Sequence, residues 1–457
     1  MRERQPSRWL LDGAGARAGR SLSAAALDDL RGADGADWFV DVESSEWWLV
    51  EGLPPASVAE AEMAGLLASH RHGVRSPDLL GHPVVVADPA LARGLRAADH
   101  RRAGGFDAWN GRVGSVVDIV ADLGVVPRSP TALERWAECP FRYFLSHVLD
   151  LRGVDDPTEA DDVDARDLGS LVHRILERFV TERGLSRPPG EAWSAPDRAR
   201  AHEIADEEAA RLEAAGRTGR PLLWRMRWDA LRRNLDRVLD ADDISRRREA
   251  MAPVEVELAF GTAEADHPPV EVALRSGRRV RFKGYIDRVD ASADRRRLAV
   301  VDYKTGNPDS HRKVRYGGEG EGDLTASGTK LQLPIYALAA RQALAGGDRA
   351  VTVDTHYWSV DDRYPLGRYG GPFDEAAEAR FVEVLEVVSD GIEAGHFPAR
   401  PGGETWSRGG PVRQNCHYCD FDTICPTTRG ERWETVRLDP RLSAYVALSD
   451  PDPGGGS

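Results

Sequence analysis

Two neighbouring stretches decide the fold: RRVRFKGYIDRVD at residues 278–290 and RLAVVDYKTG at residues 297–306. Both alternate apolar and polar side chains, which is the period of a β-strand. The polar segment ASADRRR between them is typical of a turn, so the sequence predicts an antiparallel hairpin. A hairpin symmetric about positions 294 and 295 pairs Asp287 with Asp302. Two carboxylates are therefore expected to face each other on adjacent strands.

Such a carboxylate pair calls for a cation. Like charges directly opposite in a sheet are destabilising by up to about 1 kcal/mol. Hard oxygen ligands with open coordination positions suit Mg²⁺ or Mn²⁺. Lys304 follows Asp302 by two residues, on the same face and roughly 6 to 7 Å along the strand. This reach suits a group that holds or deprotonates a metal-bound water, or that neutralises charge developing on a phosphate.

The flanking segments mix helical and strand patterns. LGSLVHRILERFV (168–180) has the apolar spacing of an amphipathic helix, in which Gly169, His173 and Glu177 form one file along the edge of the apolar stripe. An amphipathic helix of about twenty residues is expected from Ser129. Further strands are expected in VEVELAF (254–260) and VTVDTHYWSV (351–360), and further helices in 190–250, KLQLPIYALAARQAL (330–344) and PFDEAAEARFVEVLEVVSDGIEAG (372–395). This alternation predicts an α/β fold with a mixed β-sheet flanked by helices.

Length and charge bound the function. At 457 residues the chain has room for two or three domains. The net charge of −14 argues against a uniformly basic surface. Residues 275–315, however, hold 13 Lys or Arg and 5 Asp or Glu, which is enough for a phosphate-contacting patch around an acidic metal site. The residues of this patch expected to bind nucleic acid are Arg281, Lys283, Arg288, Arg312 and Lys313.

Two kinds of sequence feature are missing. None of the four lysines follows a glycine, so no Walker A loop is present and an ATP-driven motor would have to belong to a partner. No apolar run reaches the roughly 18 residues that a membrane span needs, and no signal peptide is recognisable. A cytoplasmic protein with no membrane association is therefore expected.

The four cysteines of the chain point to a second metal site. Cys416, Cys419 and Cys425 are closely spaced, and Cys139 lies 277 residues before the first of them. A disulfide framework is improbable in a reducing compartment, whereas this spacing suits metal ligation. Four thiolates fit either zinc or an iron–sulfur cluster. Such a site would tie the segment around residue 139 to the C-terminal part of the chain.

Several of these motifs occur together in one family. GYID…VVDYKTG, with GSLVHRILE upstream and LQLPIYA downstream, resembles the PD-(D/E)XK nucleases of the RecB and AddB type. CPFRYF, followed much later by CHYCDFDTIC, resembles their iron–sulfur variety. The resemblance covers roughly residues 129–430 and implies a restriction-endonuclease-like core with helical insertions and an N-terminal extension. It also favours a [4Fe-4S] cluster over zinc.

The resemblance also implies roles for individual residues. His173, Asp287 and Asp302 correspond to the metal ligands, and Lys304 to the catalytic lysine. Gln332 and Tyr336 match the downstream helix motif that positions the scissile strand, although helix packing explains these two residues equally well. For Glu255 and Glu257, exposure at a sheet edge is the preferred interpretation over a role in the site.

The expected domains are an N-terminal region (1–125), a nuclease domain with its iron–sulfur site (126–435) and a C-terminal tail (436–457). The N-terminal region is similar to the segment that precedes the nuclease in helicase–nuclease subunits. The resulting hypothesis is a Mg²⁺- or Mn²⁺-dependent deoxyribonuclease, exonucleolytic on single strands or duplex ends, that acts in DNA repair and recombination, with a separate helicase as a possible partner. Two alternatives remain: a CRISPR-adaptation nuclease, and a non-catalytic DNA-end-binding subunit of a helicase–nuclease complex.

Overall fold

The computed structural model describes residues 6–28, 30, 38–39, 49, 54–71, 76–115, 122–153, 162–314, 323–407 and 410–450. The chain divides into two compact units, residues 1–103 and residues 104–457. Among the described residues, no helix combines the length and the apolar character needed to cross a membrane.

The described part of the first unit contains helices joined by turns and irregular segments, and no strand. Its helices are α1 (Arg8–Ala18), α2 (Ala24–Asp28), α4 (Val58–Arg71), α5 (Ser76–Leu79), α6 (Pro83–Ala87) and α7 (Pro89–Ala103). They enclose two small apolar clusters, one around Leu22 and Leu27 and the other around Leu66 and Val85. Neither cluster approaches the size of the cores in the second unit.

A five-stranded sheet forms the centre of the second unit, with the strand order β1-β4-β5-β6-β7. Its strands are β1 (Met251–Phe260), β4 (Gly284–Ser292), β5 (Arg297–Lys304), β6 (Thr352–Ser359) and β7 (Gly367–Pro372). β5 and β6 run parallel while the other neighbours are antiparallel, so the predicted mixed sheet is confirmed. The predicted hairpin is also confirmed, because Arg288 pairs with Val301 and Val289 with Val300.

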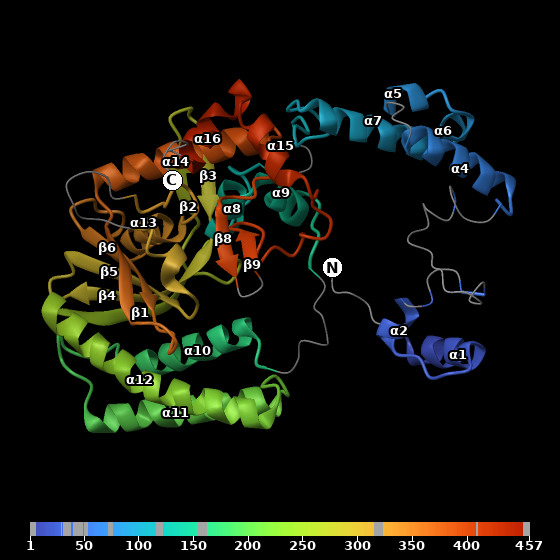
Figure 1. Ribbon diagram of the computed structural model, residues 1–457. Coiled ribbons are helices and arrows are strands. Elements are labelled where there is room, and N and C mark those ends of the chain that lie inside the picture. Colours follow the sequence, from blue (N-terminus) through green and yellow to red (C-terminus); the bar gives the residue numbers. More distant parts are fainter. Residues whose placement is uncertain are drawn as a thin grey trace. The chain divides into compact units, whose positions relative to one another are not determined.

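Helices cover both faces of this sheet (Figure 1). α10 (Ala165–Arg183), α11 (Ala195–Ala214) and α12 (Pro221–Glu249) lie against one face, around a core that includes Val301, Tyr303 and Trp358. α13 (Gln332–Ala345) and α14 (Glu375–Glu393) cover the other face, around the core that includes Val300 and Tyr357. Successive residues of β5 and β6 thus enter different cores, as the alternation of a strand buried on both faces requires.

Shorter elements complete the second unit. These are α8 (Pro130–Glu138), α9 (Pro140–Tyr143), the π-helical turn η1 (Phe144–Val148), the hairpin β2 (Val270–Ala273) and β3 (Arg279–Phe282), the 3₁₀ turn η3 (Pro308–Ser310), the hairpin β8 (Glu404–Ser407) and β9 (Gly410–Arg413), α15 (Arg429–Val436), the 3₁₀ turn η4 (Pro440–Leu442) and α16 (Ser443–Ser449). The single helix expected from Ser129 is broken at Cys139, whose φ is −154°. Pro140 explains the break, because the residue before a proline is driven out of the helical region.

The observed boundaries differ from those expected at residues 125 and 435. Residues 104–128 belong to the second unit: the N–H of Val113 donates to the carbonyl of Gly395, and the N–H of Arg281 donates to the carbonyl of Leu123. At the other end, the Tyr445 hydroxyl of α16 donates to the carbonyl of Ala137. The expected tail is therefore packed up to residue 450, and residues 451–457 lie outside the described part.

Candidate functional site

The hairpin β4–β5 brings the two predicted aspartates together. The last pair of its ladder is Arg288 with Val301, and the same register continued by one position sets Asp287 opposite Asp302. Asp302 is 3% exposed, and the negative charge of Asp287 repels that of its carboxylate. Burial, opposed by Lys304 and reinforced by Asp287, raises the pKa of Asp302 to about 6. Two acidic groups thus share one partly enclosed position.

Asp287 is held by two donors. Its Oδ2 accepts a hydrogen bond of 2.6 Å from the backbone N–H of Tyr303, and its Oδ1 lies 3.3 Å from Nδ1 of His173. Burial opposes protonation of His173, but the hydrogen bond and charge of Asp287 outweigh it and raise the histidine pKa. α10 approaches closely here, because a Cβ at Gly169 would lie 3.1 Å from Oγ1 of Thr305. Gly169, one turn before His173, therefore allows α10 to bring the imidazole to the strand ends.

Lys304 forms an ion pair with Asp302. Its Nζ also donates to Oε1 of Gln332 at 2.9 Å and lies 5.0 Å from the ring centre of Tyr357. Burial would lower the pKa of Lys304, but the carboxylate of Asp302 overrides this and raises it. The ammonium group is therefore charged and fixed in direction.

Gln332 and Tyr336 extend this chain of contacts. Gln332 begins α13, and its Nε2 donates to the Tyr336 hydroxyl at 3.3 Å. Tyr336 is 5% exposed, and burial together with Asp302 and Asp287 raises its pKa. The structure thus joins Asp302, Lys304, Gln332 and Tyr336 in one series, with Gln332 contacting the lysine directly.

Glu257 is a further acidic residue of this site. The sequence alone favours an exposed position at a sheet edge for it. Register pairs Val256 with Arg288 and Leu258 with Ile286, which sets Glu257 opposite Asp287. The residue has a φ of 46°, a left-handed conformation that is uncommon outside glycine and often marks functional positions. Burial and the charges of Asp287 and Glu177 raise its pKa to about 7.

Ligand atoms of His173, Glu257 and Asp287 all lie within 4.8 Å of one another. Asp302 stands opposite Asp287 and is turned to Lys304. We call these five residues the carboxylate site: His173, Glu257, Asp287, Asp302 and Lys304. Its carboxylate oxygens and one imidazole nitrogen are a donor set that suits a hard divalent cation such as Mg²⁺ or Mn²⁺.

The basic residues expected to contact nucleic acid separate into two groups. Lys283, Arg312 and Lys313 are exposed, and Arg281 is half-buried beside Glu271. Arg288 is 2% exposed, so the prediction that it contacts DNA is wrong. Arg315, which contributed to the local charge, lies outside the described residues.

The burial of Arg288 has a structural cause. Its guanidinium binds both carboxylate oxygens of Asp290 and also Asp242 of α12, at 2.5 to 2.9 Å. It therefore ties the long helix to the sheet, where a phosphate has no access.

The four cysteines converge, and we call them the cysteine site. They are free, half-buried and line one cavity of about 20 Å³ together with Arg142, Asn415 and Arg429. Burial raises the pKa of the Cys425 thiol to about 11. Because α8 ends at Cys139, this site adjoins the helix that packs beside α13 and α14.

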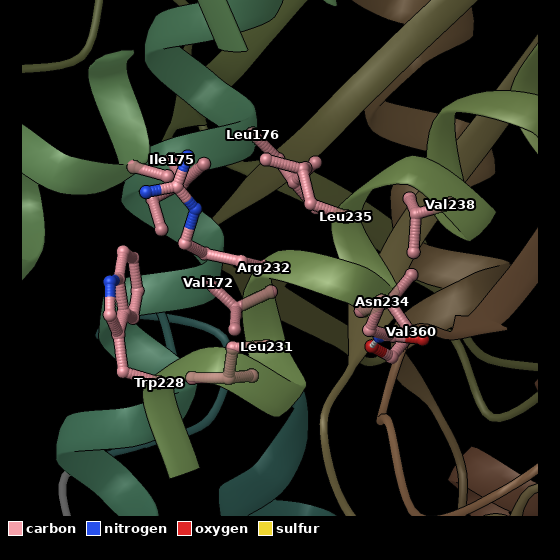
Figure 2. Close-up of a pocket in the computed structure, with 11 residues that line it drawn as sticks. Val172, Ile175, Leu176, Trp228, Leu231, Arg232, Asn234, Leu235, Val238 and Val360 are labelled. Carbon is pink, nitrogen blue, oxygen red and sulfur yellow. Dashed lines mark hydrogen bonds between the residues drawn. The ribbon is translucent and has the colours of Figure 1, made fainter. Parts of the chain in front are cut away.

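A separate apolar cavity of about 30 Å³ lies among α10, α11 and α12 (Figure 2). Its wall includes Val172, Leu231, Leu235 and Trp228. The guanidinium of Arg232 pairs with Asp206. The cavity is a gap in the packing of the helical layer and offers no reactive group.

Known proteins share sequence similarity with this chain. A model of the PD-(D/E)XK nuclease superfamily matches residues 127–426. An ATP-dependent helicase/deoxyribonuclease subunit of Moorella thermoacetica is 33% identical over 278 residues, which is 56% of this chain and 22% of that protein. The protein of the same name from Symbiobacterium thermophilum is 35% identical over 268 residues, 56% of this chain and 21% of the relative.

A third protein of that name, from Acetivibrio thermocellus, is 30% identical over 193 residues, 40% of this chain and 16% of the relative. The matched part thus spans about a fifth of the length of these relatives. The family match covers most of the second unit, including the sheet, α10, α13 and the four cysteines. This chain belongs to the PD-(D/E)XK nuclease superfamily.

Proposed function

We propose that the chain is a deoxyribonuclease that hydrolyses DNA phosphodiester bonds with Mg²⁺ or Mn²⁺. The observation that carries the proposal is the convergence of His173, Glu257 and Asp287 opposite the Asp302–Lys304 ion pair. Structural ion pairs gain nothing from an excess of acidic groups at one point, whereas a cation site requires it. Family membership gives this geometry a chemical context.

We assign each residue of the carboxylate site, and the two residues of α13 beside it, a separate role in this reaction. His173, Asp287 and Asp302, joined by Glu257, are the proposed ligands. When bound, the divalent ion supplies Lewis-acid polarisation of the phosphate and makes water more acidic. Lys304, which is charged beside Asp302, orients the attacking water or stabilises charge on the phosphate, and Gln332 fixes its ammonium group. Tyr336 supports Gln332 from the same helix.

Exonucleolytic action in repair and recombination is the biological setting that we propose. The relatives are named as subunits of an ATP-dependent helicase/deoxyribonuclease, so DNA ends and a motor protein are the proposed substrate and partner. Lys283, Arg312, Lys313 and Arg281 remain the proposed phosphate contacts. A reducing, cytoplasmic setting accords with four cysteines that form no disulfide.

For the cysteine site we propose a [4Fe-4S] cluster, with zinc as the lesser alternative. The shared cavity and the free state of Cys139, Cys416, Cys419 and Cys425 support ligation. Counting iron and zinc in anaerobically purified protein decides between the two. Iron near four atoms per chain with visible charge-transfer absorption supports the cluster, and one zinc per chain refutes it.

The two alternative functions make different predictions. A CRISPR-adaptation nuclease would share the chemistry, but the relatives found are helicase/deoxyribonuclease subunits. A non-catalytic end-binding subunit would retain DNA binding while lacking cleavage. The intact set of Asp287, Asp302 and Lys304 disfavours that second alternative.

End-labelled single- and double-stranded DNA, incubated with and without Mn²⁺, tests the proposal. We expect metal-dependent cleavage that Asp287→Asn abolishes, while Asp348→Asn, in an exposed loop, has no effect. Release of label as mononucleotides or short fragments indicates exonuclease action, and internal fragments indicate endonuclease action. If the folded, cluster-loaded protein binds DNA but cleaves neither substrate with either metal, the nuclease proposal fails.

A further inference from the structure

Glu134 is a buried acid that none of the roles above explains. It lies in α8, is 7% exposed, and points its carboxylate at the start of α13. Its Oε1 accepts hydrogen bonds from the backbone N–H of Leu331 at 2.5 Å and of Gln332 at 3.2 Å. The donor and acceptor are almost 200 residues apart in sequence.

These bonds complete a helix that lacks a cap of its own. The first N–H groups of a helix have no partner within it and usually bind a side chain at the N-cap. The N-cap of α13 is Leu331, which has no such side chain. Glu134 supplies the acceptor instead, and a negative charge at a helix N-terminus is favourable.

The capped residue is also the residue that contacts Lys304. Gln332 donates its backbone N–H to Glu134, and its own Oε1 accepts from Nζ of Lys304. A shift of the first turn of α13 therefore moves the amide that directs the ammonium group. The charge of Glu134 also acts on Lys304 and Lys330.

We propose that Glu134 is a positioning residue of the nuclease: it caps α13 and thereby holds Gln332 against Lys304. The inference rests on the proposed function and adds to it a residue that touches neither substrate nor ion. It also gives α8 a second task. Glu134 lies in α8 and Cys139 is the residue directly after that helix, so one short helix links this cap to a member of the cysteine site.

The alternative is that Glu134 merely stabilises the fold. Kinetics separate the two roles in a double-mutant cycle of Glu134→Ala and Gln332→Ala. If Glu134 acts through Gln332, we expect Glu134→Ala to lower kcat about tenfold with KM for DNA changed by less than about twofold, and to have no further effect once Gln332 is alanine. Glu134→Gln, which retains an acceptor oxygen, restores most of kcat. Glu138→Gln, one turn further along α8, is the matched control and leaves kcat unchanged.

A spectroscopic readout makes the test independent of cleavage. The chain has only four lysines, so selective ¹³C labelling at lysine Cε gives four signals. We expect Glu134→Ala to shift the signals of Lys304 and Lys330 and to leave those of Lys283 and Lys313 in place. Glu138→Gln should move none of them.

The outcomes are distinguishable. Multiplicative kinetic effects of Glu134→Ala and Gln332→Ala, or an unshifted Lys304 signal in folded Glu134→Ala, overturn the positioning role even if the wild type cleaves DNA. A wild type that cleaves nothing refutes the nuclease proposal, and the lysine spectra still report whether Glu134 positions the ammonium group. If Glu134→Ala does not fold, Glu134→Gln carries the cycle, with a smaller effect that must likewise vanish in the Gln332→Ala background.

Discussion

Replacing Lys304 with alanine removes the ammonium group that pairs with Asp302 and contacts Gln332. Its side chain is 22% exposed and that of Asp302 is 5% exposed, so this charge acts in a largely desolvated place. Removing one group that stabilises developing charge in such surroundings costs about 10²- to 10³-fold in kcat, or about 2.7 to 4 kcal/mol. We expect a loss of that size in cleavage and little change in DNA binding.

The variant should fold, and the pKa of Asp302 shows why. That pKa is raised to about 6 even though Lys304 lowers it, so protonating Asp302 at pH 7 costs on the order of 1 kcal/mol. Once Lys304 is gone, Asp302 becomes neutral rather than remaining as an unpaired buried charge. The electrostatic loss of stability in metal-free buffer is therefore capped at an order of 1 kcal/mol at pH 7 and shrinks toward pH 6.

Single-turnover cleavage of end-labelled DNA, thermal unfolding in EDTA and fluorescence anisotropy with labelled DNA measure the three quantities. Arg349→Ala, which removes an exposed partner of Glu378, is the control. Cleavage by folded Lys304→Ala within about tenfold of wild type would refute the role assigned to the lysine. A stability loss well above the cap would refute the argument about Asp302.

Four further substitutions test other parts of the structure. Glu257→Gln should weaken Mn²⁺ binding, measured by calorimetry without DNA, by about tenfold or more, because it removes a carboxylate from the trio around Asp287; unchanged affinity removes it from the ligand set. Lys283→Ala should lower the salt dependence of DNA binding by about one unit of slope, whereas Arg288→Ala should lower the unfolding midpoint through its broken ion pairs and leave that slope unchanged; the reverse pattern contradicts our placement of both residues. The pKa of His356 is lowered to about 4 by burial and by Arg368, so the unfolded chain binds more protons between pH 6.5 and 4 and stability falls as the pH drops through that window, by up to about 3 kcal/mol from this group. His356→Asn should flatten this pH dependence in thermal melts, and His100→Asn, an exposed control, should not.

The hairpin that carries Asp287 and Asp302 could be predicted from the sequence because its information is local. Alternation sets the faces of both strands and the polar turn sets the register, so the opposition of the two aspartates follows from counting. The position of His173 could also be predicted from the sequence. Helical periodicity places it in one file with Gly169, and a glycine there indicates that this side of the helix lies close to another part of the chain.

Glu257 and Glu134 depend on pairings that no local pattern reveals. Glu257 faces Asp287 only because β1 pairs with β4, after an irregularity between Pro253 and Glu255. Nothing in the sequence VEVELAF (254–260) indicates that Glu257 has a φ of 46°. Only a prediction of the strand order, with β1 beside β4, would have placed the carboxylate of Glu257 next to the predicted aspartate pair.

Arg288 shows the opposite failure. Strict alternation puts Arg288 on the strand face opposite Lys283 and Asp287, and only the basic composition of residues 275–315 suggested that it contacts phosphate. Whether such an arginine meets solvent or a carboxylate depends on which helix covers that face. Here α12 supplies Asp242, and a side chain predicted to bind phosphate becomes a buried connection between layers.

The charge balance of the carboxylate site explains why its parts belong together. Three carboxylates, those of Glu257, Asp287 and Asp302, meet one lysine and one imidazole, and burial with mutual repulsion raises the pKa of two of them, Asp302 to about 6 and Glu257 to about 7. Lys304 neutralises Asp302 alone, because it pairs with that residue directly. Without a further cation, Asp287 is stabilised by His173 and by the N–H of Tyr303, and the raised pKa of Glu257 means that keeping its carboxylate charged at neutral pH costs folding free energy. A divalent ion would replace protons on these carboxylates and relieve the repulsion across the hairpin, so the same crowding of acidic groups that opposes folding prepares the site to hold a metal.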